Sequence, residues 1–170
     1  PQEAAAMLAA HPPTLVAAAL QELNPGFTLD ILDALPAEYA SAVTSWVPSE
    51  VAQQWERNRG CPEDSIGRLM EPAYAVLSAD MTVGETIERL RALVKVAFVT
   101  YGYVVDANGR LRGLVTMRDL LFADNALRLD AVMLREVFCL TPAMALGDAM
   151  KLVLDRHYPV YPVCDADGRL

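Results

Sequence analysis

Thr116, Arg118 and Asp119 form the strongest candidate binding site in this sequence. A β-rich run, Leu111–Val115, precedes them and a helical pattern begins at Met117, so Thr116 stands where a strand meets a helix. The first N–H groups of a helix lack intrahelical partners and suit a phosphate. Arg118 adds a bidentate cation, and the carboxylate of Asp119 can accept hydrogen bonds from ribose hydroxyls. The three residues therefore predict a nucleotide site.

A structural role explains the same spacing equally well. Thr116 and Asp119 occupy the two positions of a capping box, which closes the start of many helices. Gly113, upstream of them, has no side chain and would let a ligand or a neighbouring chain approach the backbone. From the residues alone, helix capping and nucleotide binding both remain open.

The acidic residues are distributed unevenly along the chain. The first 55 of the 170 residues contain six acids and no lysine or arginine, within a net charge of −8. Nucleic-acid-binding proteins present a basic face, so this pattern argues against that class. Carboxylates without a counter-ion attract a divalent cation or a basic partner, and a solvated acidic surface is the alternative. The six are Glu3, Glu22, Asp30, Asp33, Glu38 and Glu50.

The cysteines and histidines argue against thiolate-metal or catalytic chemistry. Cys61, Cys139 and Cys164 are widely separated without a CxxC pair, and only His11 and His157 accompany them. We therefore expect reduced, mostly buried cysteines and no zinc site. No base stands beside a serine or cysteine, so we do not expect an enzyme. The sequence shows no signal peptide, and no apolar run reaches the roughly 18 residues of a membrane span.

Residues 1–56 are predicted to form an acidic, all-helical domain. Prolines at regular intervals separate short apolar helical patterns, with joints at Leu23-Asn24-Pro25, Leu35-Pro36 and Val47-Pro48. Proline suits the first turn of a helix and ends the helix before it. Such a stack of short helices resembles a small solenoid. The polar stretch 57–63, which contains glycine and proline, is the predicted linker.

From residue 64 onward, one pattern of strands and helices occurs twice. Tyr103–Leu111 reads YVVDANGRL, and Pro162–Leu170 reads PVCDADGRL, 59 residues later. Upstream, residues 82–85 recur at 145–148, an offset of 63. Two copies of one unit predict two β-α-β-β-α repeats, 64–126 and 127–170, about a pseudo-twofold axis with sites at the seam.

The elements of the first repeat can be placed along the chain. The second repeat has Ala145 where the first has its capping threonine, Thr82, and it stops inside its motif at Leu170. We therefore expect the sequence to be a piece of a longer protein. The predicted elements are a helix at 65–70, a strand at 74–77, a helix after the Thr82–Glu85 capping box, strands at 101–105 and 111–115 joined by the Asn108-Gly109 turn, and a helix at 117–122.

The repeat, its Asp-x-[Asn/Asp]-Gly turn and the Gly113–Asp119 pattern G-x-x-[S/T]-x-x-D together resemble a cystathionine-β-synthase (CBS) domain. Two in tandem resemble a CBS pair. The resemblance implies an adenosine nucleotide, such as ATP, bound by Thr116, Arg118 and Asp119, with Tyr158 and Val160 lining the base pocket. It also implies a homodimer formed through the CBS pair.

The segments 62–70, 101–106 and 116–124, preceded by acidic helices, are similar to the MgtE-type magnesium channels. That resemblance implies an α+β fold with a short solenoid-like helical domain before the CBS pair. It implies a Mg²⁺-sensing region at the cytoplasmic face of the cell membrane that closes a transmembrane pore of the same full-length chain. Mg²⁺ would bridge acidic residues between the two domains. The implied metal residues are Asp30, Asp33 and Glu38, facing Asp64 and Gly67.

The sequence departs from that family in three places. The helical region is shorter than the family's N domain, and the second G-x-x-[S/T]-x-x-D would begin beyond Leu170. His157 stands where the family often has an acidic residue, so we expect a buried or nucleotide-facing imidazole there and not an ion contact. Two alternatives therefore remain open: a nucleotide-sensing CBS module that serves another effector, and a dimerising scaffold without a ligand.

Overall fold

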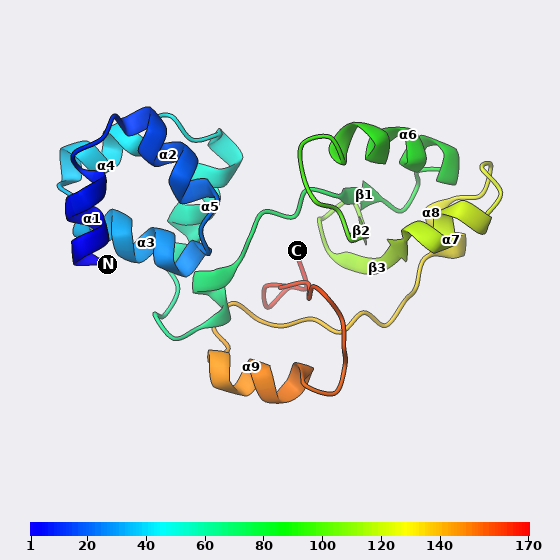
Figure 1. Cartoon of the computed structure of the whole chain (residues 1–170). Coiled ribbons are helices and arrows are strands. Elements are labelled where there is room, and N and C mark those ends of the chain that lie inside the picture. The colour runs from blue at the N-terminus through cyan, green and yellow to red at the C-terminus, as the bar shows by residue number, and fades with distance from the viewer. The chain divides into compact units, whose positions relative to one another are not determined.

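The computed structural model describes the whole chain, residues 1–170, as two compact units. The helical unit comprises residues 1–72 and 142–148, and the sheet unit comprises residues 73–141 and 149–170 (Figure 1). Helices together with a small mixed sheet make the chain an α+β protein, as predicted. No helix has both the length and the apolar character that crossing a membrane requires.

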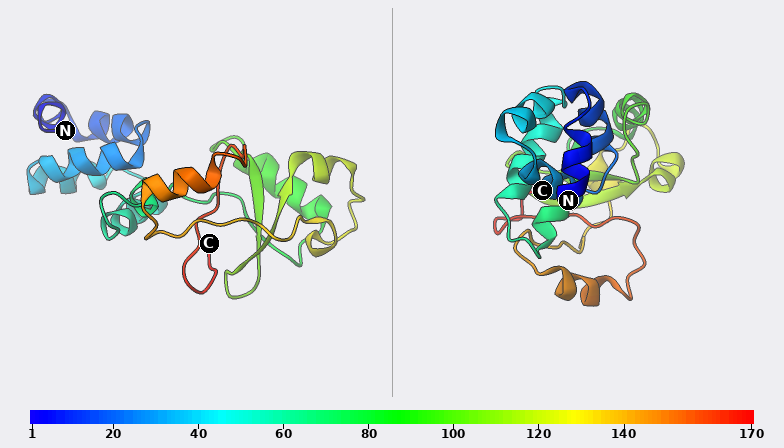
Figure 2. Two further views of the ribbon diagram at one scale, coloured as in Figure 1. Left: turned by 90° about the horizontal axis from the view of Figure 1, so that it is seen from below. Right: turned by 60° about the vertical axis from the view of Figure 1, so that its left-hand side comes forward.

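Five α-helices and one 3-10 helix make up most of the helical unit. The α-helices lie together, from blue to cyan, in both views of Figure 2. Helix α1 packs against α3, α2 against α4 and α3 against α5, which is the contact pattern of a short helical solenoid. The elements are α1 (Gln2–Leu8), α2 (Pro13–Gln21), α3 (Pro25–Ala34), α4 (Ala37–Thr44), α5 (Ser49–Arg59) and η1 (Ile66–Leu69).

Prolines set the helix boundaries in this unit. Pro25 occupies the first turn of α3, and the Asn24 side chain before it accepts a hydrogen bond from the Gly26 N–H at 2.9 Å. Pro36 and Pro48 are the N-cap residues of α4 and α5 in extended conformations, with ψ of 134° and 140°. The predicted helix joints are therefore confirmed, because proline can begin a helix but cannot continue one.

The apolar faces of these helices meet in one core. Val16, Leu20, Leu29 and Val43 are fully buried, and Trp55 on α5 joins them. Burial of aliphatic side chains on this scale is the main force that holds short helices in a stack, because helices of about ten residues are marginal alone.

The predicted linker, 57–63, was wrong at its start. Residues 57 to 59 form the last turn of α5, and Gly60 ends the helix. Asn58 explains the difference because its side chain is fully buried and donates a hydrogen bond to the Met70 carbonyl at 2.7 Å. The Gln54 side chain in turn donates to the Asn58 side chain at 2.7 Å. These polar residues are thus part of the packed unit, although their composition is typical of a loop.

The sheet unit contains one regular sheet with the strand order β1-β2-β3. Strand β2 pairs in parallel with β1 and antiparallel with β3. Leu77, Val83, Val104 and Val115 lie in the core beneath the helices. The elements are β1 (Val76–Ser78), α6 (Val83–Leu93), β2 (Tyr101–Val105), β3 (Leu111–Thr116), α7 (Met117–Phe122) and α8 (Leu129–Val132). All strands and helices predicted for residues 74–122 are present, with β1 two residues later than predicted at its start.

The two copies of the repeated Asp-Ala-[Asn/Asp]-Gly motif adopt the same turn. The carboxylate of Asp106 accepts hydrogen bonds from the N–H groups of Asn108 and Arg110, at 2.9 and 3.0 Å. Asp165 does the same for residues 167 and 169, at 2.9 and 2.8 Å. Gly109 and Gly168 both have positive φ, of 77° and 79°. The predicted hairpin turn is therefore confirmed, and the accepted hydrogen bonds lower the pKa of Asp106.

The 63-residue offset also appears in backbone hydrogen bonds. In the helical unit, the Leu146 N–H donates to the Asp64 carbonyl, and the Ile66 N–H donates to the Met144 carbonyl, each at 2.8 Å. In the sheet unit, the Val83 N–H donates to the Leu127 carbonyl, and the Leu129 N–H donates to the Met81 carbonyl, also at 2.8 Å. These are the same two bonds with the roles of the repeats exchanged. Each repeat therefore pairs its first residues with the segment that precedes a helix of the other repeat.

The predicted helix at 65–70 is the short 3-10 helix η1 and not an α-helix. The Arg68 N–H donates to the Ser65 carbonyl, three residues back, at 3.2 Å, which is the 3-10 pattern. The N–H groups of Ile66 and Gly67, which the start of any helix leaves free, donate to residues 144 and 142.

The second repeat is less regular than the first. Its helix, α9 (Leu146–Val153), is present, and Leu140 pairs in parallel with Val163, as Leu77 pairs with Val104 in the first repeat. Here the pairing is an isolated bridge and not part of a regular strand.

Candidate functional site

The segment after β3 forms the capping box that the sequence suggested. The backbone N–H and the hydroxyl of Thr116 donate to Oδ2 of Asp119 at 3.0 and 2.7 Å. The Asp119 N–H returns a hydrogen bond to the Thr116 hydroxyl at 3.2 Å. Capping is therefore confirmed as one role of these residues. Because these bonds use Oδ2, the second carboxylate oxygen of Asp119 is the one that can meet a ligand.

Arg118 and Asp119 line a shallow pocket of about 380 Å³ in the sheet unit. The other lining side chains are apolar. The pocket thus combines two charged groups with an apolar surface, which suits a ligand with a polar and an aromatic part. The apolar lining residues are Phe122, Ala123, Leu127 and Val132.

Tyr158 and Val160 do not line this pocket. Tyr158 instead packs edge-to-face on Tyr161, with ring centroids 5.7 Å apart, and Tyr161 packs on Phe138 at 6.2 Å. The guanidinium of Arg156 lies 3.9 Å above the Phe138 ring. Tyr158 thus belongs to an aromatic cluster of the second repeat, whereas Val160 is an exposed side chain.

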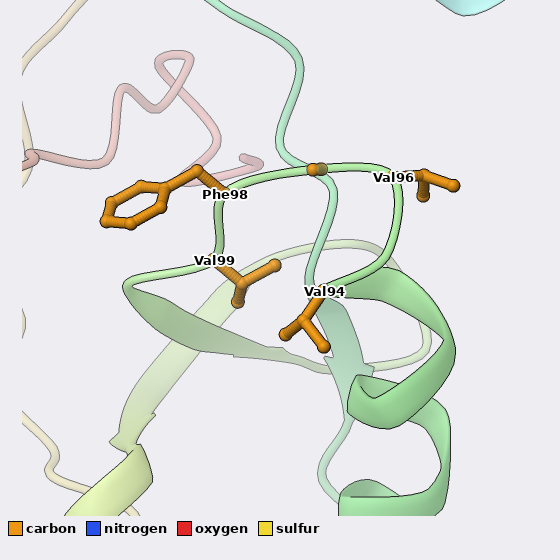
Figure 3. Close-up of a pocket in the computed structure, with 5 residues that line it drawn as sticks. Val94, Val96, Phe98 and Val99 are labelled. Carbon is orange, nitrogen blue, oxygen red and sulfur yellow. The ribbon is translucent and has the colours of Figure 1, made fainter.

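A second pocket, of about 500 Å³, lies along the loop from Val94 to Val99. Figure 3 shows Phe98 and Val96 projecting away from each other on this loop, and Phe98 is 93% exposed. With the 59-residue offset, Val99 is the counterpart of Tyr158. Sequence reasoning missed this loop, although applying the offset to Tyr158 would have found it.

The predicted metal residues lie in the helical unit but do not come together. The structure contains no group of three or more acidic, histidine or cysteine side chains that could hold a metal ion. Asp33 instead pairs with Arg59 at 3.0 Å, and Asp30 pairs with Arg68 at 3.4 Å. Glu38 lies in the first turn of α4. Two arginines that follow the acidic region in sequence thus return to it in space and act as counter-ions for two of its six carboxylates.

The two glycines singled out in the sequence have packing roles. The Gly67 N–H donates to the Pro142 carbonyl at 2.8 Å, and a Cβ on Gly67 would lie 2.3 Å from the sulfur of Cys61. A Cβ on Gly113 would lie 2.6 Å from the Leu134 carbonyl oxygen. The space expected for a ligand or another chain at Gly113 is therefore filled by this chain itself.

Comparison with known proteins places these features in a family. The CBS domain family matches residues 66–126 and 129–170. The chain belongs to the CBS domain family. The repeat boundaries, the turn and the capping box described above are thus features of two CBS domains in tandem.

The chain is also similar to regions of MgtE-type magnesium transport proteins. The cytosolic domain of the Mg²⁺ channel MgtE, solved in complex with ATP, is 31% identical with a TM-score of 0.84, covering 99% of this chain and 69% of that one. The soluble part of a magnesium transporter has the same fold at 24% identity, with a TM-score of 0.82 over 96% of this chain and 64% of that one.

The magnesium transporter MgtE of Thermus thermophilus is 37% identical over 109 residues, which are 64% of this chain. The chain spans about a quarter of that relative, 24% of its length.

The three cysteines of the chain differ in exposure. Cys164 is buried, whereas Cys61 and Cys139 are half-buried, so the expectation of mostly buried cysteines was wrong for two of the three. The parallel bridge between Leu140 and Val163 places Cys139 and Cys164 on two adjacent segments of the chain. A hydrogen bond from the Cys164 thiol lowers the pKa of Cys139 to about 7.

We predict that Cys139 is the most reactive thiol of the chain. Its lowered pKa leaves more of it as thiolate near pH 7 than of an ordinary cysteine, so iodoacetamide should modify it several times faster than Cys61. The rate should fall as the pH drops below 7, because the thiol is then protonated. Peptide mass spectrometry measures both rates. In Cys164→Ala the advantage of Cys139 should disappear, and an unchanged rate there would contradict the assignment.

Proposed function

We propose that this chain is a regulatory, non-catalytic region of a magnesium transport protein, in which Mg²⁺ favours a compact arrangement of the helical domain and the CBS pair that closes the pore. The observation that carries the proposal is the match of 99% of the chain to the cytosolic domain of the channel MgtE. The pore would be a transmembrane domain of the same full-length protein, and the region would lie at the cytoplasmic face of the membrane.

The charge pattern supports a cation as the effector. Acidic surfaces repel one another, and a divalent ion placed between them removes that repulsion. Mg²⁺ keeps most of its water and needs only one or two carboxylates, so a cluster of three is not required. Glu38 and Asp64 are the sequence-predicted carboxylates without an ion pair in the structure. Closure follows only if Mg²⁺ binds the compact state more tightly than the open one.

A Mg²⁺ titration of the chain tests this proposal. We expect Mg²⁺ at ten times its dissociation constant to stabilise the chain by about 1.4 kcal/mol, which raises the melting temperature by roughly 3–6 °C. The segment 60–63 should become resistant to limited proteolysis over the same range. KCl at matched ionic strength is the control. Equal digestion and equal melting in Mg²⁺ and KCl would reject Mg²⁺ sensing by this chain.

We further propose that an adenosine nucleotide binds at the Arg118–Asp119 pocket. The pocket combines a guanidinium for phosphate, a carboxylate for ribose and an apolar wall for the base. The relative solved with ATP supports this choice of ligand. Tyr158 and Val160 would contribute only if the aromatic cluster of the second repeat rearranges on binding.

Asp119→Asn separates binding from capping, because the amide oxygen can still accept the Thr116 hydrogen bonds. We expect the dissociation constant for ATP to rise roughly tenfold, since a charge-assisted hydrogen bond contributes about 1.5 kcal/mol. The melting temperature should fall by only about 1–4 °C, because the amide keeps the cap bonds but loses the charge at the helix N-terminus, worth about 0.3–1 kcal/mol. Isothermal titration calorimetry measures the affinity, and Asp124→Asn, at an exposed turn nearby, is the matched control. If Asp119→Asn and the unchanged chain bind ATP with equal affinity, Asp119 caps the helix but does not contact the nucleotide.

We propose that two copies associate through their CBS pairs. Leu121 and Phe122 on α7 are 75% and 81% exposed, which is unusual for large apolar side chains of a stable monomer. Light scattering measures the molecular mass. A dimer that persists while neither Mg²⁺ nor ATP binds would favour the scaffold alternative, and ATP binding without a Mg²⁺ effect would favour a nucleotide-sensing module.

A further inference from the structure

Two carboxylates of α3 that a divalent cation could use are already neutralised by this chain. Asp30 and Asp33 stand three residues apart and therefore share one face of the helix. Arg68 on η1 reaches Asp30 at 3.4 Å, and Arg59 on α5 reaches Asp33 at 3.0 Å. Each carboxylate has one guanidinium, so the face carries no net charge from these four groups.

The two arginines are held by more than the aspartates. The Arg68 side chain is only 9% exposed, and its backbone N–H bonds to the Ser65 carbonyl at 3.2 Å. Arg59 also pairs with Glu56 of its own helix at 2.9 Å. Both pairs join elements that lie 26 and 38 residues apart in sequence. They therefore fasten α3 to α5 and η1.

A divalent cation at this face would have to displace a guanidinium. Taking Asp30 away from Arg68 leaves a buried charge without its partner, which is strongly unfavourable. Mg²⁺ would in addition have to give up part of its tightly held water. Both pairs therefore offer Mg²⁺ little attraction. The larger obstacle is at Asp30, because Arg68 is buried, whereas Arg59 and Asp33 are partly exposed.

We infer that Arg59 and Arg68 act as built-in cations that fasten α3 and exclude Mg²⁺ from Asp30 and Asp33. The inference rests on the proposed function only in that Mg²⁺ acts on other carboxylates of the chain. It also means that the junction of α3 with α5 and η1 is stable without Mg²⁺.

The experiment uses Mn²⁺ as a paramagnetic probe in place of Mg²⁺ and follows amide NMR signals of the whole chain. In the unchanged chain, the amide signals of residues 30–34 should stay sharp at Mn²⁺ concentrations that broaden the signals around any other cation site. In Arg59→Gln they should broaden at concentrations roughly ten times lower, because a positive charge close to Asp33 has been removed. Excess Mg²⁺ should restore them.

Two further variants make the result decisive. Arg57→Gln removes a positive charge from the same turn of α5 but from a residue bonded to Gln54 and not to an acid, so residues 30–34 should stay sharp. Arg59→Gln combined with Asp33→Asn should lose the new broadening. Early broadening of residues 30–34 in the unchanged chain, or none in Arg59→Gln, would overturn the inference. If no signal broadens anywhere in the unchanged chain, that result contradicts the proposed Mg²⁺ sensing but not the inference about Arg59 and Arg68.

Discussion

Gly67→Ala should destabilise the helical unit by about 3 kcal/mol, the upper end of what overpacking usually costs, and lower its melting temperature by roughly 6–12 °C. A Cβ at this position would lie 2.3 and 2.6 Å from the sulfur and Cβ of Cys61 and 2.9 Å from the Pro142 carbonyl oxygen. The cysteine side chain is short and the carbonyl is backbone, so neither can move aside cheaply. The clash would also push Gly67 away from Pro142, with which it shares a hydrogen bond of 2.8 Å.

Gly147→Ala is the matched control for this prediction, because Gly147 belongs to the same unit and a Cβ there meets no atom within 4 Å. It lies in α9, where alanine is favoured over glycine by up to about 1 kcal/mol, so a small rise in melting temperature is expected. Thermal unfolding followed by circular dichroism measures both variants. Cys61→Gly should rescue part of the loss in Gly67→Ala, and additive effects of the two changes would show that Cys61 is not the obstacle.

Gly113→Ala should have a comparable effect in the sheet unit, again about 3 kcal/mol. The new Cβ would lie 2.6 Å from the Leu134 carbonyl oxygen and 2.7 Å from the Met133 sulfur. Met133 is flexible and can yield, but the Leu134 carbonyl is fixed by hydrogen bonds exchanged with Leu114 at 2.8 and 2.9 Å. The substitution therefore forces β3 away from the first residues after α8. Since β3 leads directly into Thr116, the nucleotide pocket should loosen as well, and ATP affinity should fall with stability.

Gly84→Ala serves as the control in the same unit, because its nearest neighbours would lie at 3.4 Å or more, in ordinary contact. Its melting temperature should stay within a degree or two of the unchanged chain, in keeping with the small effect of a tolerated surface substitution. Urea unfolding measured by tyrosine and tryptophan fluorescence gives the free energies. A Gly113→Ala protein as stable as Gly84→Ala would mean that residues 133–134 can move aside, and that the glycine is free to meet a ligand after all.

The strands and caps were predictable because local rules decide them. The Thr82–Glu85 and Thr116–Asp119 capping boxes and the Asp106 turn depend on residues three or four apart, which the sequence places in contact by itself. The repeat was predictable for a different reason. The repeated segments can be recognised by comparing the sequence with itself. The same offset of 63 residues relates the equivalent backbone hydrogen bonds of the two repeats.

The candidate sites were predicted less well, because their chemistry depends on partners distant in sequence. Two of the six acids of residues 1–55 lack a counter-ion only along the chain, since Arg59 and Arg68 return to Asp33 and Asp30 in the fold. Likewise, the linker composition of 57–59 gave no sign that Asn58 would be buried against Met70.

The sequence by itself thus determined the α+β class, the tandem CBS repeats, the turns and the helix starts, because periodicity and short-range hydrogen bonding encode them. Only the tertiary structure decided which carboxylates keep their charge exposed and what fills the space beside Gly67 and Gly113. Those outcomes are set by contacts between segments up to about 75 residues apart, for which the chain carries no local pattern.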